Sequence, residues 1–144
     1  MPPPGSYISG PAPDGSSGYF KEGIYALKSK SSSIYLNGGT SPGGYAIMRP
    51  GNPLQDPQLH WVIRHCDQGY YSLFSISGRG YLDGRNKEIL ECCVTDRQPQ
   101  GDIYLNWEIG QADGFTTLKC KSNGHYLDGR AVDGHVAYAT GRSP

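Results

Sequence analysis

The sequence has no excess of charge of either sign, because 13 Lys and Arg residues stand against 13 Asp and Glu residues in a chain of 144. Proteins that bind nucleic acids or anionic membrane surfaces draw much of their affinity from a surplus of basic side chains. The sequence also has no run approaching the roughly 18 apolar residues of a membrane-spanning helix. We therefore expect neither nucleic acid as a partner nor insertion into a membrane.

Cysteine is scarce, and its spacing is not that of a disulfide framework or a metal site. The four residues are Cys66, Cys92, Cys93 and Cys120, and no Cys-X2-Cys or His-X3-His pair occurs. Adjacent side chains in a strand point to opposite faces, so Cys92 and Cys93 are not expected to bridge. We expect free thiols, with Cys93 and Cys120 as small core residues, and neither a metal nor another cofactor.

The first residues lack the basic and apolar regions of a secretory signal, and the chain has no Asn-X-Ser/Thr glycosylation site. Thiols that stay free are typical of a reducing compartment. These features predict a cytoplasmic protein.

Glycine and proline are abundant, with 21 and 11 residues, or about 22% of the chain and roughly twice the average. This content disfavours long helices. Eleven Tyr and two Trp supply the large, half-buried surfaces that pleated sheets favour. We expect a single all-β domain over residues 1–144, since this length is typical of one domain.

An internal repeat of 45 to 46 residues runs through the chain. Its clearest sign is a motif found at Tyr35-Leu36-Asn37-Gly38, Tyr81-Leu82-Asp83-Gly84 and Tyr126-Leu127-Asp128-Gly129. A strand that begins with glycine precedes each motif by about ten residues, and its leucine keeps the same spacing, at Leu27, Leu73 and Leu118. A tryptophan strand follows the first two motifs, at Trp61 and Trp107. Three landmarks with one period indicate three related units.

Each unit has room for about four short strands, because alternating apolar residues are interrupted by Gly, Pro, Asn and Asp. A propeller blade has a similar length, but a propeller needs at least four blades. Three units of four strands predict a β-trefoil with pseudo-threefold symmetry, in which each repeat contributes one Leu and one Trp or its equivalent to a shared core. The repeats are expected at about 23–68, 69–113 and 114–144.

The third repeat ends before a tryptophan strand of its own, because the position 45 residues after Trp107 lies beyond Pro144. The 22 residues before the first repeat hold two apolar pairs, Tyr7-Ile8 and Tyr19-Phe20. We expect residues 1–22 to supply the twelfth strand, since an open sheet edge and an exposed core would otherwise result. The alternative is a tail outside an incomplete trefoil.

The motif resembles that of the ricin-B-like β-trefoil lectins, and the small mushroom lectins of that group are the most similar. Asn37 and Asp83 each precede a tryptophan by 24 residues, and the resemblance covers residues 23–144. It implies a lectin without enzymatic activity that binds glycans ending in galactose or N-acetylgalactosamine, with up to three sites. The family motif also has Gln-X-Trp, but Leu59 and Leu105 stand in the register of that glutamine. The resemblance therefore supports the role of the tryptophan in the core better than the role of the polar residue in binding.

The predicted carbohydrate-binding residues stand at the ends of the Tyr-Leu strands and directly before the tryptophans. They are Asn37, Gly38 and His60 in the first repeat, Asp83, Gly84, Arg85 and Asn106 in the second, and Asp128, Gly129 and Arg130 in the third. A carboxylate can accept two sugar hydroxyls while a nearby Arg or N–H group donates to others. Glycine lets a backbone amide approach a ligand closely.

Two of the three repeats combine an acceptor with a donor, as Asp83 with Arg85 and Asp128 with Arg130. The first repeat has Asn37 and no arginine there, so its site should be weaker or differently selective. The apolar face of galactose would stack on an aromatic ring. The candidates for this ring are Tyr45, Tyr104 and Tyr138.

Three other interpretations remain open at this point, and the neutral charge and the presence of only four His residues disfavour the last of them, an actin-bundling trefoil. Asp-Gly is also a strong hairpin-turn signal, so these residues would serve the turn alone. Alternatively the chain is a protease inhibitor of the trefoil class that acts through the proline-rich loop at 49–57. An inhibitor of this kind would have no reason to repeat Asp-Gly-Arg. No catalytic residues are predicted. Each shallow site would bind weakly by itself, and avidity across the repeats, or across the copies of a homodimer, would raise the overall affinity.

Overall fold

The computed structural model describes residues 20–29, 34–84, 92–112, 115–122, 124–128 and 138–140. These residues form strands and two short 3-10 turns, η1 (Pro57–Leu59) and η2 (Ile103–Leu105). The many glycines, prolines and Asx residues end each strand after three to six residues, as the composition predicts. No helix in the described part of the chain is long and apolar enough to cross a membrane.

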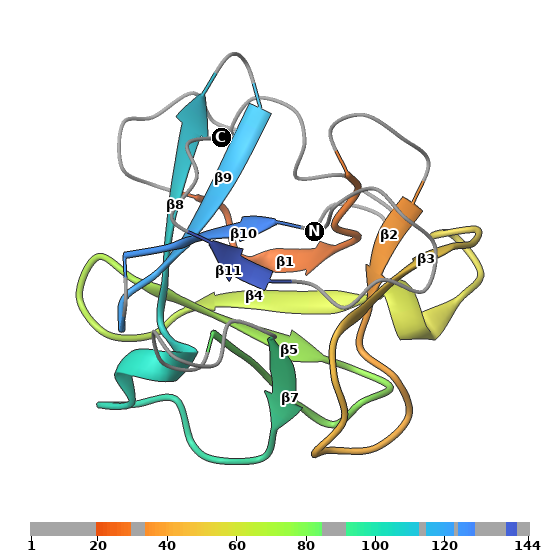
Figure 1. Ribbon diagram of the computed structural model, residues 1–144, viewed down its shortest axis with the longest axis horizontal. Helices are drawn as coiled ribbons and strands as arrows, with labels where there is room; N and C mark the ends of the chain where they lie inside the picture. The colour runs from red at the N-terminus through yellow and green to blue at the C-terminus, as the bar shows by residue number, and fades with distance from the viewer. Residues whose placement is uncertain are drawn as a thin grey trace.

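Five strands form the wall of a barrel. They pair in the order β1 (Gly23–Tyr25), β4 (Trp61–His65), β5 (Tyr71–Ser75), β8 (Trp107–Ala112) and β9 (Phe115–Cys120), each antiparallel to its neighbours. Strands β4 and β5 cross the middle of the molecule, and β8 and β9 stand together at one side of it (Figure 1). The two strands that begin with tryptophan, β4 and β8, each lie between two other strands of this wall.

Three hairpins connect these strands. They are β2 (Ile34–Asn37) with β3 (Ile47–Pro50), β6 (Gly80–Asp83) with β7 (Cys93–Thr95), and β10 (Tyr126–Asp128) with β11 (Tyr138–Thr140). The leucine of each Tyr-Leu motif has an equivalent partner, since Leu36 pairs with Met48, Leu82 with Val94 and Leu127 with Ala139. The fold is therefore a β-trefoil, as the repeat predicts, and the three hairpins have the same pairing register.

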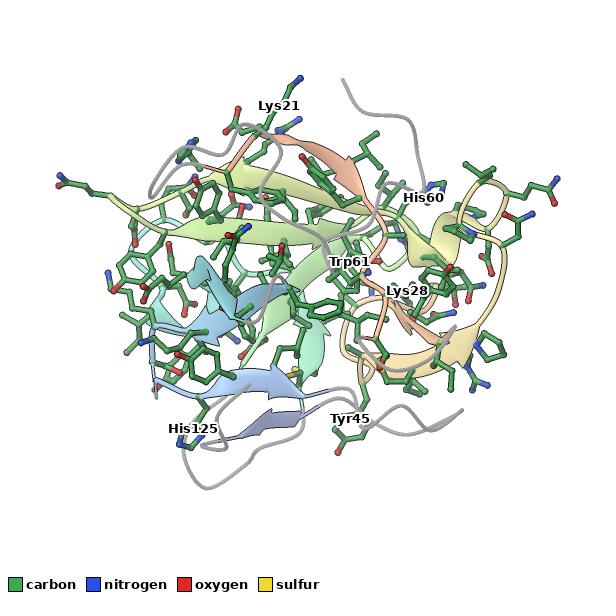
Figure 2. All side chains as sticks on the ribbon, turned by 90° about the horizontal axis from the view of Figure 1, so that it is seen from above. Lys21, Lys28, Tyr45, His60, Trp61 and His125 are labelled. Atoms are coloured by element: carbon green, nitrogen blue, oxygen red, sulfur yellow. The ribbon has the colours of Figure 1, made fainter. Side chains whose placement is uncertain are left out.

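The core contains the residues that carry the repeat. Leu27, Leu73 and Leu118 are buried, and Trp61 and Trp107 have no exposed surface. Figure 2 shows Trp61 in the middle of the molecule. The indole Nε1 of each tryptophan donates to a leucine carbonyl 25 residues earlier, Leu36 for the first and Leu82 for the second, both at 3.0 Å. The prediction that the tryptophans are core residues is confirmed.

The end of the N-terminal segment enters this core at Phe20. Its side chain is 3% exposed, and its ring packs against Tyr25 at 5.0 Å between centroids and against Tyr71 at 6.2 Å. The Phe20 N–H donates to the Tyr71 hydroxyl at 2.6 Å. The predicted twelfth strand would lie between β9 and β1, but residues 1–19 are outside the described part of the chain. That part of the prediction stays a prediction.

All four cysteines are free thiols. Cys92, Cys93 and Cys120 are buried in the interior, as predicted for the last two, and Cys66 is partly exposed. Burial raises the pKa of the Cys92 thiol well above its ordinary value. Cys92 is therefore an uncharged, apolar core residue rather than a nucleophile.

Candidate functional site

The structure brings the predicted residues of the first two repeats into equivalent places. Asn37 ends β2 and Asp83 ends β6, and each hairpin end contacts the 3-10 turn that precedes the next tryptophan. The N–H of Gly38 donates to the Gln58 carbonyl at 3.0 Å, and the N–H of Gly84 donates to the Tyr104 carbonyl at 2.9 Å. The candidate site is the surface where each hairpin end meets this turn.

Gly38 and Gly84 do not offer their amides to a ligand, because both N–H groups are bonded within the fold. The expectation that they do so is wrong. Their reason for being glycine is packing. A Cβ on Gly38 would collide with the side chain of Ser75, and a Cβ on Gly84 would collide with Cys120 and lie 3.2 Å from the Trp107 ring. Gly129 of the third repeat is outside the described residues.

Asp83 is buried at the end of β6 and forms an ion pair with Arg97. Its side chain is 2% exposed, and Arg97 Nη2 lies 3.1 Å from Asp83 Oδ2. The expected partner, Arg85, is outside the described residues. The Asp83 carboxylate is thus enclosed by the protein rather than open to two sugar hydroxyls.

Arg97 connects Asp83 to a second carboxylate. Its Nε donates to Asp102 Oδ2 at 2.9 Å, and its Nη1 lies 3.4 Å from Thr95 Oγ1. The hydrogen bond to Asp102 is the largest cause that raises the pKa of the Arg97 guanidinium, and the charges of both carboxylates add to it. The side chain is 48% exposed. The second repeat therefore presents a fixed, charged guanidinium at its hairpin end.

The first repeat has no such charge at the equivalent place. Asn37 is 6% exposed, its Nδ2 donates to Gln58 Oε1 at 3.0 Å, and its Oδ1 accepts from Gly39 N at 2.7 Å. Gly51 stands 46 residues before Arg97, where the second repeat has its guanidinium. The amide of Asn37 is used inside the fold, so the two sites differ in charge as well as in residue type.

His60 and Asn106, the predicted residues before the tryptophans, hold loops. His60 Nε2 lies 2.7 Å from the Pro53 carbonyl, and Asn106 Nδ2 donates to the Pro99 carbonyl at 2.9 Å. Pro53 and Pro99 are 46 residues apart, so the side chains of His60 and Asn106 bond to equivalent loops of the two repeats. Asn106 also donates to the Asp102 carbonyl at 2.8 Å and has no exposed surface. A direct contact between Asn106 and a sugar, expected from sequence, is therefore excluded by burial.

The third repeat is described only in part. Asp128 ends β10 opposite Tyr138, which matches the backbone position of Asn37 and Asp83. The side chains of these two residues, and Arg130, are outside the described part of the chain.

Two of the three candidate aromatic rings can be located. Tyr45 is 54% exposed and projects away from the ribbon (Figure 2). Tyr104 is half-buried and belongs to the second-repeat site, since its N–H donates to Asp102 Oδ1 at 3.0 Å and its carbonyl accepts from Gly84. The backbone N–H of Tyr104 and the side chain of Arg97 thus both donate to the Asp102 carboxylate.

Arg97 and Asp102 are the site residues that sequence reasoning missed. A signal for Asp102 was present, because Asp56-Pro57-Gln58-Leu59 and Asp102-Ile103-Tyr104-Leu105 repeat with the same period of 46. Each aspartate caps its 3-10 turn by accepting from the N–H two residues later. Arg97 has no counterpart in the first repeat, so the repeat pattern could not reveal it.

Comparison with solved structures shows the same fold. A designed threefold-symmetric protein, ThreeFoil, has a TM-score of 0.72 at 21% identity, covering 83% of this chain and 90% of its own. A mosquitocidal holotoxin has a TM-score of 0.75 at 13% identity, and a GlcNAcα1-4Gal-releasing endo-β-galactosidase from Clostridium perfringens has 0.70 at 13%. These cover 87% and 86% of this chain, which spans 16% and 30% of their lengths.

No protein-family model matches the sequence, and no curated protein matches it. The structural likeness, at these identities, establishes the β-trefoil fold.

Proposed function

We propose that the protein is a lectin without enzymatic activity that binds glycans ending in galactose or N-acetylgalactosamine. The observation that carries the proposal is the charged cluster of Asp83, Arg97 and Asp102 at the end of β6. It stands at the hairpin position where the resemblance to ricin-B-like lectins puts a sugar ligand. The guanidinium of Arg97 supplies hydrogen-bond donors, and the half-buried Tyr104, whose backbone N–H is bonded to Asp102, is the candidate for the apolar ring that sugar recognition also uses.

The fold supports this proposal. One structural neighbour is named as an enzyme that releases GlcNAcα1-4Gal, a disaccharide that contains galactose. A β-trefoil also hosts unrelated functions, so the site has to carry the argument. The repeated placement of Asn37, Asp83 and Asp128 at hairpin ends supports the proposal of up to three sites on one chain.

The second repeat is the strongest of these sites among the described residues. Its guanidinium is held by two carboxylates, whereas the amide of Asn37 in the first repeat is bonded to Gln58 and Gly39. Avidity across several weak sites would raise the overall affinity for a glycan surface, and a homodimer would raise it further. We also propose a cytoplasmic location, which the four free thiols support.

A glycan array with the full chain tests the proposal, after cooperative thermal unfolding has shown that the sample is folded. We expect capture by glycans that end in galactose or N-acetylgalactosamine, competed by free galactose and not by free mannose. Bound glycans should be recovered intact, as a lectin leaves them. A blank array, or capture that mannose and galactose compete equally, would contradict the proposal.

A protease inhibitor is a second candidate function, because the loop at 49–57 is rigid and has an exposed tip. Leu54 is 68% exposed, while Pro53 beside it is buried. Asn52 holds the loop by accepting from the N–H groups of Leu54, Gln55 and Asp56 at 2.9 to 3.0 Å. The equivalent position in the second repeat is Gln100, so the apolar tip is not repeated. A preorganised loop with one apolar anchor fits a protease cleft.

A panel of serine and cysteine proteases tests this second candidate. Inhibition by the wild type that Leu54→Ser removes and Gln100→Ser leaves unchanged would support it. No inhibition of any protease at micromolar concentration would reject it.

A further inference from the structure

We propose that Arg97, and not Asp83, is the residue that contacts the glycan in the second repeat, and that this site selects uncharged sugars. The inference rests on the proposed carbohydrate-binding function and assigns the roles within that site. In this assignment Asp83 is a positioning residue, which holds the guanidinium of Arg97.

Exposure separates the two residues. Asp83 is 2% exposed and Arg97 is 48% exposed, although their charged groups lie 3.1 Å apart. A ligand in solvent reaches the guanidinium without disturbing the fold. It could reach the carboxylate only by displacing Arg97 and leaving a buried charge without its ion pair, which is strongly unfavourable.

Arg97 keeps donors for a ligand. A guanidinium has five N–H groups. In the described structure Nε uses its N–H on Asp102, one N–H of Nη2 goes to Asp83, and one N–H of Nη1 faces Thr95. One N–H remains on each terminal nitrogen, and this pair is suited to the oxygens of adjacent sugar hydroxyls.

Charge sets the class of ligand. Asp83 and Asp102 place two negative charges against the single positive charge of Arg97, and the exposed Asp96 directly precedes Arg97 in the chain. Counted over these described residues, the cluster is negative. A carboxylate or sulfate on a sugar would be repelled by Asp83 and Asp102, whereas a hydroxyl would not. We expect neutral galactose or N-acetylgalactosamine ends to bind, and the same ends with sialic acid or sulfate to bind less well.

The test uses Arg97→Gln and Asp83→Asn in the full chain, with Arg64→Gln as a matched control that removes an exposed arginine from β4. Binding is followed by titration with N-acetylgalactosamine in two-dimensional NMR, because the amide resonances of Gly84 and Tyr104 report on the second repeat alone. We expect Arg97→Gln to weaken binding at these resonances about tenfold or more, since it removes hydrogen bonds from a charged donor. Arg64→Gln should bind as the wild type does.

The selectivity of Asp83→Asn between charged and neutral sugars is the second measurement. A purely structural role of Asp83 would leave this selectivity unchanged. The substitution removes one negative charge while keeping the size of the side chain. We expect the ratio of affinities for sialylated over neutral galactose ends to rise several-fold, even though neutral binding weakens because Arg97 loses its ion pair with Asp83 and keeps only the one with Asp102.

Two results would overturn the assignment while leaving the lectin intact. One is loss of binding in Asp83→Asn with Arg97→Gln unaffected, and the other is an unchanged selectivity ratio in Asp83→Asn. If the wild type captures no glycan at all, the proposed function fails instead, so the two failures are distinguishable.

Discussion

Several residues that a sequence motif assigns to a ligand are held inside this fold. Gly38, Gly84, Asp83 and Asn106 are all buried, and each has a structural partner. The motif located the ends of β2 and β6, but it gave no information on which of these side chains are exposed. The reason is physical: the position of a strand end follows from local sequence, whereas the exposure of its side chain depends on segments far away in the chain.

Gly84→Ala should destabilise the protein by about 1–3 kcal/mol, because the added methyl group would overlap Cys120 beside the Trp107 ring. Gly44→Ala is the control, since no atom lies within 4 Å of the position that its Cβ would take. The free energy of unfolding by urea measures both. Equal effects of the two substitutions would show that packing is not what requires Gly84.

Arg79→Gly should stabilise the protein by about 1 kcal/mol. Arg79 has a φ of 56°, the only positive φ of a non-glycine residue in the described part of the chain. Left-handed backbone disfavours residues with a Cβ. The third repeat has Gly124 at the equivalent place, with a φ of 68°, and both N–H groups bond to the carbonyl four residues earlier at 2.9 Å. Urea unfolding tests this as well, and a loss of stability would mean that the contact of Arg79 with the Thr40 carbonyl outweighs the strain.

At the scale of elements, the strands were predictable and the loops between them were not. Alternating apolar residues and the turn residues that end them located β2, β6 and the strands that begin with tryptophan. The loops before η1 and η2 depend on side chains that reach across them, such as His60 to Pro53 and Asn106 to Pro99. A residue beside a tryptophan could equally face a ligand or a loop, and sequence alone does not distinguish these.

Asn106→Ala should destabilise the protein by about 2–3 kcal/mol, because it removes hydrogen bonds to the Pro99 and Asp102 carbonyls and to the Asp67 N–H in a buried place. His60→Asn should be nearly neutral, since it gives the first repeat the residue that the second repeat already uses. Thermal unfolding of the two variants checks both statements. If Asn106→Ala changed glycan binding and left stability intact, its role as a loop holder would be wrong.

At the scale of the whole molecule, the three repeats depend on one another. The Ser77 hydroxyl in the turn between β5 and β6 donates to the Gly39 carbonyl of the first repeat at 2.6 Å, β4 of the first repeat pairs with β5 of the second, and β8 of the second pairs with β9 of the third. The core also receives Phe20 from the segment before the first repeat. Stability therefore depends on the contacts between repeats and not on any single repeat.

Phe20→Ala should destabilise the protein by about 3 kcal/mol, because it empties a buried place against Tyr25 and Tyr71. Thermal unfolding measures this loss. Deletion of residues 1–19 with Phe20 retained then tests the predicted twelfth strand, for which we expect a further large loss. An unchanged melting temperature in the deletion would reject that strand.

The sequence by itself determined the fold class, the period and the core. These depend on local patterns: alternation along a strand, glycine and Asx residues at its end, and leucine and tryptophan returning every 45 to 46 residues. Only the tertiary structure decided which polar groups face solvent. Arg97 meets Asp83 across a hairpin from 14 residues away, and it has no equivalent in the first repeat. Such a pairing joins the end of β6 to the segment after β7, and no local pattern encodes it.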